Sequence, residues 1–263
     1  MAKFEGTSAV VTGASSGIGR AVAIALAEAG AAKILVHYRK NQAGAEETAE
    51  AIKQFGTDPI LCSADIACGE ARQQLVATAF EQLGTVETWV NNAGADVLTG
   101  EAASLDFQSK LEHLLSVDVV GTIDLSRLVA KRMLAIQQEE IPSFTFVGWD
   151  QAPLGMEGDA GQMFGPVKAA VMAFANSFAQ SLAPQIRVNT IAPGWIQTAW
   201  GDTTSEYWNG RARGQSLMNR WGKPEDIANA VVFAADPVNS FLTGQTITLN
   251  GGWNRHYVDA SQD

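Results

Sequence analysis

A glycine-rich turn, TGASSGIG at residues 12–19, is the first stretch of the chain that could do chemistry. An apolar run leads into the turn and a helical pattern leads out, so the expected local structure is strand, turn, helix. Gly13 permits a tight turn, Gly17 permits close approach to a phosphate, and Gly19 permits close packing of helix on strand. We expect a phosphate or another anion to bind at the helix N-terminus, through Gly13, Ser15, Ser16, Gly17, Ile18 and Gly19. The alternative is a turn that only joins a strand to a helix.

The elements that must position this turn follow from the alternation of short β-branched runs with longer helical patterns. This alternation predicts parallel strands with helices on both faces. The expected strands cover residues 8–11, 33–38, 59–63, 86–94, 144–149, 186–191 and 246–250. The expected helices cover residues 20–29, 43–55, 69–83, 107–115, 122–138, 162–182 and 224–235. We therefore expect a single α/β domain over residues 1–263, a Rossmann-type doubly wound parallel sheet of about seven strands, with a polar tail at 254–263.

Composition argues against several classes of partner. The formal net charge of −10 disfavours a nucleic-acid or anionic-membrane surface, because either would repel the chain. The two cysteines, Cys62 and Cys68, lack the CxxC spacing of a zinc site and are too few for a disulfide framework, so no metal site is expected. No apolar run approaches the length needed to span a bilayer. We expect a cytoplasmic protein whose partner is a small organic ligand.

Further motifs accompany the glycine turn: NNAG at 91–94, Asp65 after the third expected strand, PGWIQT at 193–198, and RWGKPEDIA followed by FLTGQTITLNGGW at 220–253. Together they resemble the short-chain dehydrogenase/reductase family, most closely its 3-oxoacyl carrier-protein reductase branch, over nearly the whole chain. The resemblance implies a nicotinamide nucleotide as cofactor. It implies that the adenine is bordered by Asp65 and Ile66, and that the remainder is held by Asn91, Ala93, Gly94, Lys168, Pro193, Gly194, Ile196 and Thr198.

The end of the second expected strand bears on the choice of nucleotide. NAD-preferring members of the resembled family place an acidic residue there to accept hydrogen bonds from the ribose 2′-hydroxyl. Here Tyr38 and Arg39 occupy the corner, with Lys40 next. Because a guanidinium suits a phosphate, we expect NADP(H) to be preferred over NAD(H). A solvated basic loop is the alternative. His37 is expected to be packed or hydrogen-bonded near this edge rather than catalytic.

The catalytic positions depart from the resembled family. Its reductases use a Tyr-x-x-x-Lys pair, a serine about thirteen residues before the tyrosine, and an asparagine on the preceding long helix. Here FGPVK puts Phe164 at the tyrosine position and retains Lys168. Counting back, the serine position falls on Gln151, or on Asp150 if the loop differs by one residue, and the asparagine position falls on Asp118. We expect Asp118 and Lys168 to form a structural ion pair rather than a proton relay.

Phenylalanine has no proton to give to a carbonyl oxygen, so three functions remain open. One is an atypical oxidoreductase acting on a small carbonyl or alcohol, in which another group such as Asp150 replaces the phenol, or whose substrate needs no enzyme acid. Another is a nucleotide-binding sensor or partner subunit without turnover. The third is a non-redox enzyme on the same scaffold.

The expected substrate side is rich in aromatic residues. Tryptophans lie in the run 149–156 and in the run 195–208. They predict either a pocket with a lid for an apolar or aromatic ligand, or a packing interface. The resemblance also implies a homotetramer, with a dimer as the weaker alternative, in which small residues let helices approach, namely Ala169, Ala170, Ala173 and Ala175.

Overall fold

A parallel sheet forms the centre of the molecule. The computed structural model describes residues 3–136, 139–202 and 204–257. Within these ranges a 7-stranded sheet has the order β3-β2-β1-β4-β5-β6-β7, and each neighbouring pair is parallel. The strands are β1 (Ser8–Val11), β2 (Lys33–Tyr38), β3 (Asp58–Ser63), β4 (Thr88–Asn91), β5 (Ser143–Val147), β6 (Arg187–Pro193) and β7 (Thr246–Leu249). The expected doubly wound α/β fold is confirmed.

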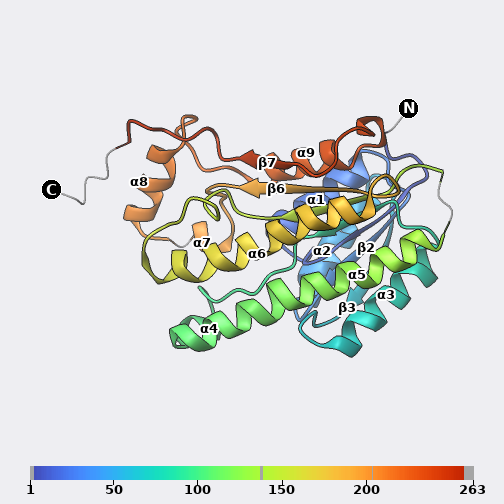
Figure 1. The fold of residues 1–263 in the computed structure, drawn as a ribbon, viewed down its shortest axis with the longest axis horizontal. Helices are drawn as coiled ribbons and strands as arrows, with labels where there is room; N and C mark the ends of the chain where they lie inside the picture. The colour runs from blue at the N-terminus through green and yellow to red at the C-terminus, as the bar shows by residue number, and fades with distance from the viewer. Residues whose placement is uncertain (1–2, 137–138, 203, 258–263) are drawn as a thin grey trace.

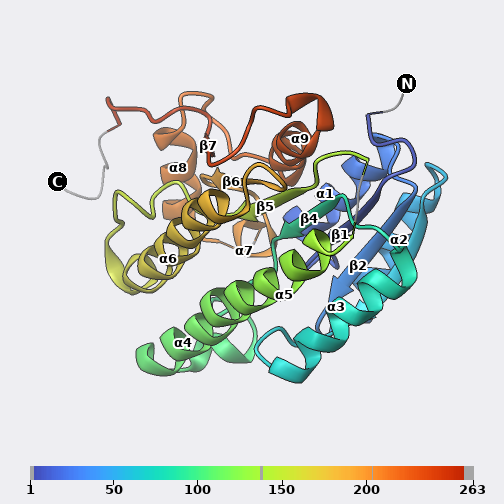
Figure 2. The same ribbon diagram turned by 45° about the vertical axis from the view of Figure 1, so that its right-hand side comes forward.

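Helices cover both faces of the sheet. The longer ones are α1 (Gly17–Glu28), α2 (Gln42–Lys53), α3 (Gly69–Leu83), α4 (Phe107–Leu114), α5 (Thr122–Leu134), α6 (Gly158–Leu182), α8 (Glu206–Gln215) and α9 (Pro224–Ala235). Side chains of α3, α5 and α6 share one core with the sheet, and those of α1, α2 and α9 share the other. Figure 2 shows α3, α5 and α6 side by side on their face of the sheet.

The burial of each strand matches its place in the sheet. The central strands β1, β4, β5 and β6 are buried at every position, as strands with helices on both faces of the sheet require. The edge strands β3 and β7 alternate between exposed and half-buried residues. The side chain of Trp89 on β4 is fully buried in the α3–α5–α6 core.

Most element boundaries lie close to their predicted positions. The bounds of β1, β2, α3 and α9 match the expectation, whereas α6 begins at Gly158 rather than 162 and β4 ends at Asn91 rather than 94. A π-helical segment, Leu115–Gly121, joins α4 to α5 into one continuous helical run. The helix expected to end at Gln138 ends at Leu134, and residue 138 lies outside the described ranges.

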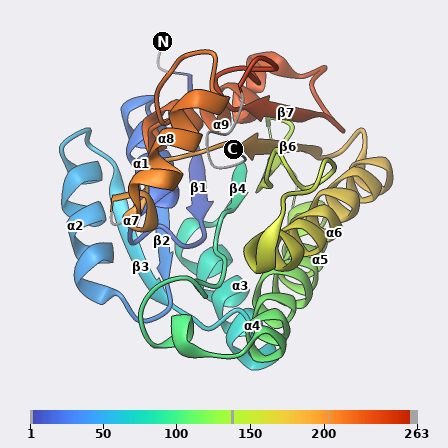
Figure 3. The same cartoon turned by 90° about the vertical axis from the view of Figure 1, so that its left-hand side faces the viewer.

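The four-residue helix α7 (Ala199–Asp202) and the helix α8 were not predicted. They lie at the end of the molecule toward which β6 and β7 point (Figure 1), and Figure 3 looks onto this end of the sheet. In open α/β sheets the carboxyl ends of the strands are where ligands bind. Among the helices that the structure describes, none is long and apolar enough to cross a membrane.

Candidate functional site

The glycine turn between β1 and α1 adopts conformations that only glycine tolerates well. Gly13 has φ of 65° and Gly17 has φ of 52°. A Cβ on Gly13 would lie 2.9 Å from the Cα of Ala93, and a Cβ on Gly19 would overlap the carbonyl oxygen of Gly13. The α1 N-cap, Ser16, makes no capping hydrogen bond with its side chain. The turn is therefore closely packed against Ala93, and the N–H groups at the start of α1 are available to bind an anion.

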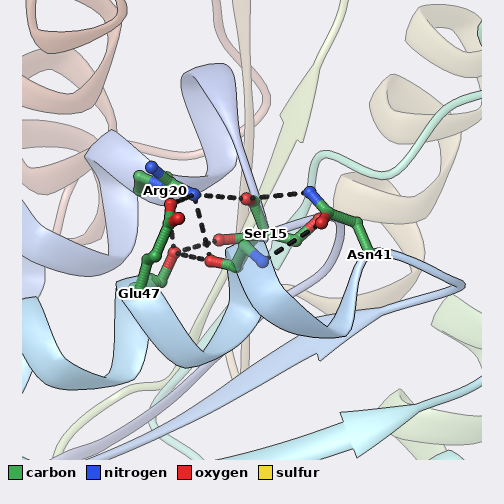
Figure 4. Close-up of polar contacts among 7 residues, drawn as sticks. Ser15, Arg20, Asn41 and Glu47 are labelled. Atoms are coloured by element: carbon green, nitrogen blue, oxygen red, sulfur yellow. Dashed lines mark hydrogen bonds and ion pairs between the residues drawn. The ribbon is translucent and has the colours of Figure 1, made fainter.

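A polar network fixes the turn to the start of α2, as Figure 4 shows. Arg20 donates to the carbonyl oxygens of Ser15 and Gly44, at 2.8 and 3.1 Å, and pairs with Glu47 at 2.8 Å. Asn41 caps α2 by accepting from the Gly44 N–H at 3.1 Å, and its amide nitrogen lies 3.5 Å from the Ser15 oxygen. Because the Ser15 carbonyl is held from behind, the turn is preorganised before any ligand arrives.

His37 supports the same turn from β2. Its Nδ1 accepts from the Gly13 N–H at 3.1 Å, and its Nε2 donates to the Ala64 carbonyl at 3.0 Å. A backbone N–H can only donate and a carbonyl can only accept, so the ring is the neutral Nε2–H tautomer. Burial lowers the pKa of His37 to about 4, partly opposed by the hydrogen bond to Ala64 and the charge of Asp65. His37 is thus a structural bridge, in agreement with the expectation.

The corner after β2 carries exposed cations. Arg39 and Lys40 are exposed, Tyr38 is half-buried, and no ion pair involves Arg39 in the described ranges. Asp65, one of the residues expected at the adenine, uses one carboxylate oxygen to accept from the Ala67 N–H at 2.9 Å. Ile66 is buried at the same edge. This corner can present a guanidinium to a phosphate.

The two asparagines after β4 point in different directions. Asn91 is buried, accepts from the Trp89 indole at 3.1 Å and donates to the Ser126 hydroxyl at 3.1 Å. Asn92 instead donates to the carbonyl oxygens of Thr12 and Gly13, at 3.0 and 3.2 Å, and lines the cavity described next. The side chain of Asn91 therefore supports the core. Asn92 was not predicted, although the NN pair at the end of a strand was a usable signal.

A cavity of about 330 Å³ opens beside the glycine turn at the carboxyl end of the sheet. One side is formed by Ile18, Asn92, Pro193, Gly194, Ile196 and Thr198. The other side is formed by residues of the β5–α6 connection and of α6, namely Trp149, Met156, Ala160, Phe164 and Lys168. Thr198 also stands over the turn, since a Cβ on Gly17 would lie 3.7 Å from its methyl group.

Lys168 is the charged residue on the cavity wall. Its Nζ lies 3.2 Å from the Asp118 carboxylate, whose second oxygen accepts from the Ala95 N–H at 2.7 Å. Asp118 sits in the π-helical segment and is 3% exposed, so it is held behind the lysine rather than in the cavity. Phe164, one helical turn before Lys168, packs half-buried against Val97 and other apolar side chains. The structure thus unites Asp118, Phe164 and Lys168.

Asp150 and Gln151 lie outside the cavity lining, and Trp149 lies in it. Asp150 accepts from the Asn250 amide at 2.9 Å, and its other oxygen is buried without a partner. Burial raises the pKa of Asp150, although the hydrogen bond from Asn250 opposes the shift. Gln151 is 2% exposed and its amide nitrogen has no hydrogen-bond partner. Because the loop turns inward after Trp149, an indole takes the place in the wall that sequence counting assigned to Gln151.

Tryptophans from distant segments form the outer wall. Trp195 lies 5.7 Å from Trp208 on α8 and 6.0 Å from Trp221, between ring centroids, and all line the cavity. Behind them Arg211 lies 5.2 Å from the Trp208 ring and forms a bidentate ion pair with Glu157. The aromatic pocket predicted from the runs 149–156 and 195–208 is present. Trp221 was missed as a member, because it comes from the segment before α9.

The comparisons with known proteins agree with this geometry. Residues 13–254 match the family model described as enoyl-(acyl carrier protein) reductase. A 3-oxoacyl-[acyl-carrier-protein] reductase FabG of Staphylococcus epidermidis is 32% identical over 248 residues, 93% of this chain and 98% of that protein. A short-chain dehydrogenase from Burkholderia cenocepacia, solved in complex with NADP, has a TM-score of 0.84 at 27% identity and covers 95% of this chain and 98% of its own. A 7α-hydroxysteroid dehydrogenase complexed with NADH and 7-oxo glycochenodeoxycholic acid also has a TM-score of 0.84, at 29% identity and 96% coverage of both chains. The extent of these matches and the shared fold establish that the chain belongs to the short-chain dehydrogenase/reductase family of oxidoreductases.

Proposed function

We propose that this protein is an NADP(H)-dependent oxidoreductase whose substrate site lacks the tyrosine of its family. The observation that carries the proposal is the cavity itself. It joins the glycine-turn side, with Ile18 and Asn92, to an opposite side that carries Lys168 and apolar side chains, tryptophans among them. The substrate class is a small apolar or aromatic molecule bearing a carbonyl, an alcohol or a related group. When bound, the reduced nicotinamide would supply a hydride.

The geometry of the glycine turn and of the cavity supports the binding of a nicotinamide nucleotide. The positive φ angles of Gly13 and Gly17 and the uncapped helix start would hold the pyrophosphate. Pro193, Gly194 and Thr198 line the cavity and would hold the nicotinamide end, and Lys168, which also lines it, would bind the adjoining ribose. Asp118 keeps that ammonium group oriented through the 3.2 Å ion pair.

The preference for NADP(H) rests on the corner after β2. Both NADP and NADH occur in the structural neighbours, so the neighbours alone do not decide between them. Arg39 supplies an exposed guanidinium, and no carboxylate stands at the end of β2. We expect NADPH to bind at least about tenfold more tightly than NADH by calorimetric titration, and Arg39→Gln to remove most of the difference. Equal affinities in the unmodified protein would refute the preference.

The absence of a phenol predicts poor reduction of ordinary ketones. A positioned general acid contributes about 10²–10⁴ in rate, and Phe164 cannot act as one. We expect micromolar NADPH binding together with near-background turnover of activated ketones. The double variant Phe164→Tyr with Trp149→Ser should raise that turnover by about 10²-fold or more.

The matched control is Phe164→Tyr with Gln151→Ser, which places the hydroxyl outside the cavity and should recover less. Rapid ketone turnover by the unmodified protein would overturn the proposed site. A nucleotide-binding protein without turnover is the second candidate, and the lack of a hydroxyl group at position 164 favours it. Such a protein would bind NADPH and stay inert in both double variants.

Both cysteines are free thiols, which fits our further expectation of a cytoplasmic protein.

A further inference from the structure

Few side chains in the cavity could donate a proton to a substrate. Apart from the indole N–H groups of its tryptophans, the polar side chains among its described lining residues are those of Asn92, Thr198 and Lys168. Asn92 already directs its amide group to two carbonyl oxygens of the glycine turn. Lys168 is held by Asp118, and the two charges cancel at 3.2 Å. The cavity is therefore electrically near neutral and contains no phenol or carboxylic acid in the described part of its wall.

The same cavity is rich in aromatic side chains. Trp149, Trp195, Trp208, Trp221 and Phe164 all line it. Aromatic faces attract cations within about 6 Å, tryptophan most strongly. The outer wall already does so on its far side, where the Arg211 guanidinium lies 5.2 Å from the Trp208 ring with its charge compensated by Glu157. The net charge of −10 also favours the approach of a cation over that of an anion.

We propose that the cavity takes a planar organic cation of the iminium class, a substrate with a C=N⁺ bond in an apolar or aromatic framework. This inference rests on the proposed hydride chemistry and names its substrate class. A hydride from the bound reduced nicotinamide would bring both electrons to the carbon, the C=N π pair would become the nitrogen lone pair, and the positive charge would pass to the nicotinamide ring. No proton enters or leaves. Reduction of an iminium ion therefore needs no proton donor at position 164, where Phe164 stands. Reduction of a ketone, by contrast, would leave an alkoxide that needs a proton.

The first test measures binding without turnover. An N-methyl dihydroisoquinolinium salt and tetralone, a neutral bicyclic ketone of similar size, are titrated against nucleotide-free protein by calorimetry. We expect the cation to bind at least about tenfold more tightly than the ketone.

Trp149→Leu should weaken cation binding about fivefold or more and ketone binding much less, with Phe164→Leu as a second variant of the cavity wall. Trp253→Leu, at an exposed indole outside the cavity lining, is the control and should change neither. Equal affinity for the two compounds, or equal loss of both in Trp149→Leu, would overturn the inference.

The second test uses the tyrosine variant. With NADPH present, the protein should reduce the iminium salt above the enzyme-free rate, and Phe164→Tyr should change that rate less than about twofold while it raises tetralone reduction. If Phe164→Tyr accelerated both reactions alike, the inference would be contradicted, but the proposed function would not. The same holds if the protein bound NADPH but did not reduce the iminium salt. Failure to bind NADPH would instead contradict the proposed function, because cation binding to the nucleotide-free protein is measured separately.

Discussion

At the residue level, the ion pair between Asp118 and Lys168 has a measurable consequence. Asp118 is 3% exposed and Lys168 is 18% exposed, so removing the carboxylate leaves an ammonium group only partly solvated. We expect Asp118→Asn to lower the free energy of unfolding by about 1–3 kcal/mol in urea titrations and to weaken NADPH binding. Glu50→Gln is the control, because both members of its ion pair with Lys53 are exposed, at 71% and 52%, and it should cost less. An unchanged Asp118→Asn protein would contradict a structural role for the pair.

His37 predicts a pH dependence of stability. Its folded-state pKa of about 4 lies below the ordinary value of 6.5, so the unfolded chain binds the proton more readily. The contribution of neutral His37 to the free energy of unfolding is fully present above pH 6.5. It is lost as the pH falls from 6.5 toward 4, and the loss amounts to at most about 3 kcal/mol. Carboxylates also titrate near the lower end of this window, so the informative quantity is the difference from His37→Gln, which should show a flatter profile.

The exposed His256 provides the control for this measurement, and His256→Gln should keep the pH profile of the unmodified protein. If His37→Gln lost stability between pH 6.5 and 4 as steeply as the unmodified protein, the neutral bridge between Gly13 and Ala64 would not be the cause.

At the level of elements, the ion pair between Arg211 and Glu157 ties α8 to the start of α6. Arg211 is 8% exposed at its side chain and packs against the rings of Trp195 and Trp208. We expect Glu157→Gln to speed amide hydrogen exchange in α8 about tenfold, because the buried guanidinium loses its charge partner. Glu50→Gln removes the exposed pair with Lys53 and should leave α8 unaffected. Unchanged protection of α8 in Glu157→Gln would mean that the aromatic wall alone holds the helix.

At the level of the whole molecule, exposed apolar side chains around α9 and β7 predict association. Phe241 is fully exposed, Val238 is 85% exposed and Phe233 is 51% exposed. We expect a homotetramer, with a dimer as the weaker alternative, and we expect Phe241→Asp to reduce the sedimenting mass. A monomer in sedimentation velocity at micromolar concentration would contradict this prediction. Ala175, one of the small residues of α6 that were expected to let helices of two subunits approach, is instead buried in the protein's own core.

The local pattern of the sequence was sufficient for features that depend on nearby residues. The bounds of β2, α3 and α9 follow from apolar runs, helical periodicity and a proline at the first turn of a helix. The positive φ angles of Gly13 and Gly17 follow from the turn motif. The placement of Phe164 and Lys168 one helical turn apart follows from their spacing.

Only the tertiary structure decided which side chains meet in the site. The inward turn of the loop after β5 puts Trp149 in the cavity wall and buries Gln151, and the end of β4 directs Asn92 rather than Asn91 toward the glycine turn. Trp221 reaches the same wall from a segment distant in sequence. These outcomes depend on contacts between residues far apart in the chain and on the packing space left by the sheet, which no local window of sequence contains.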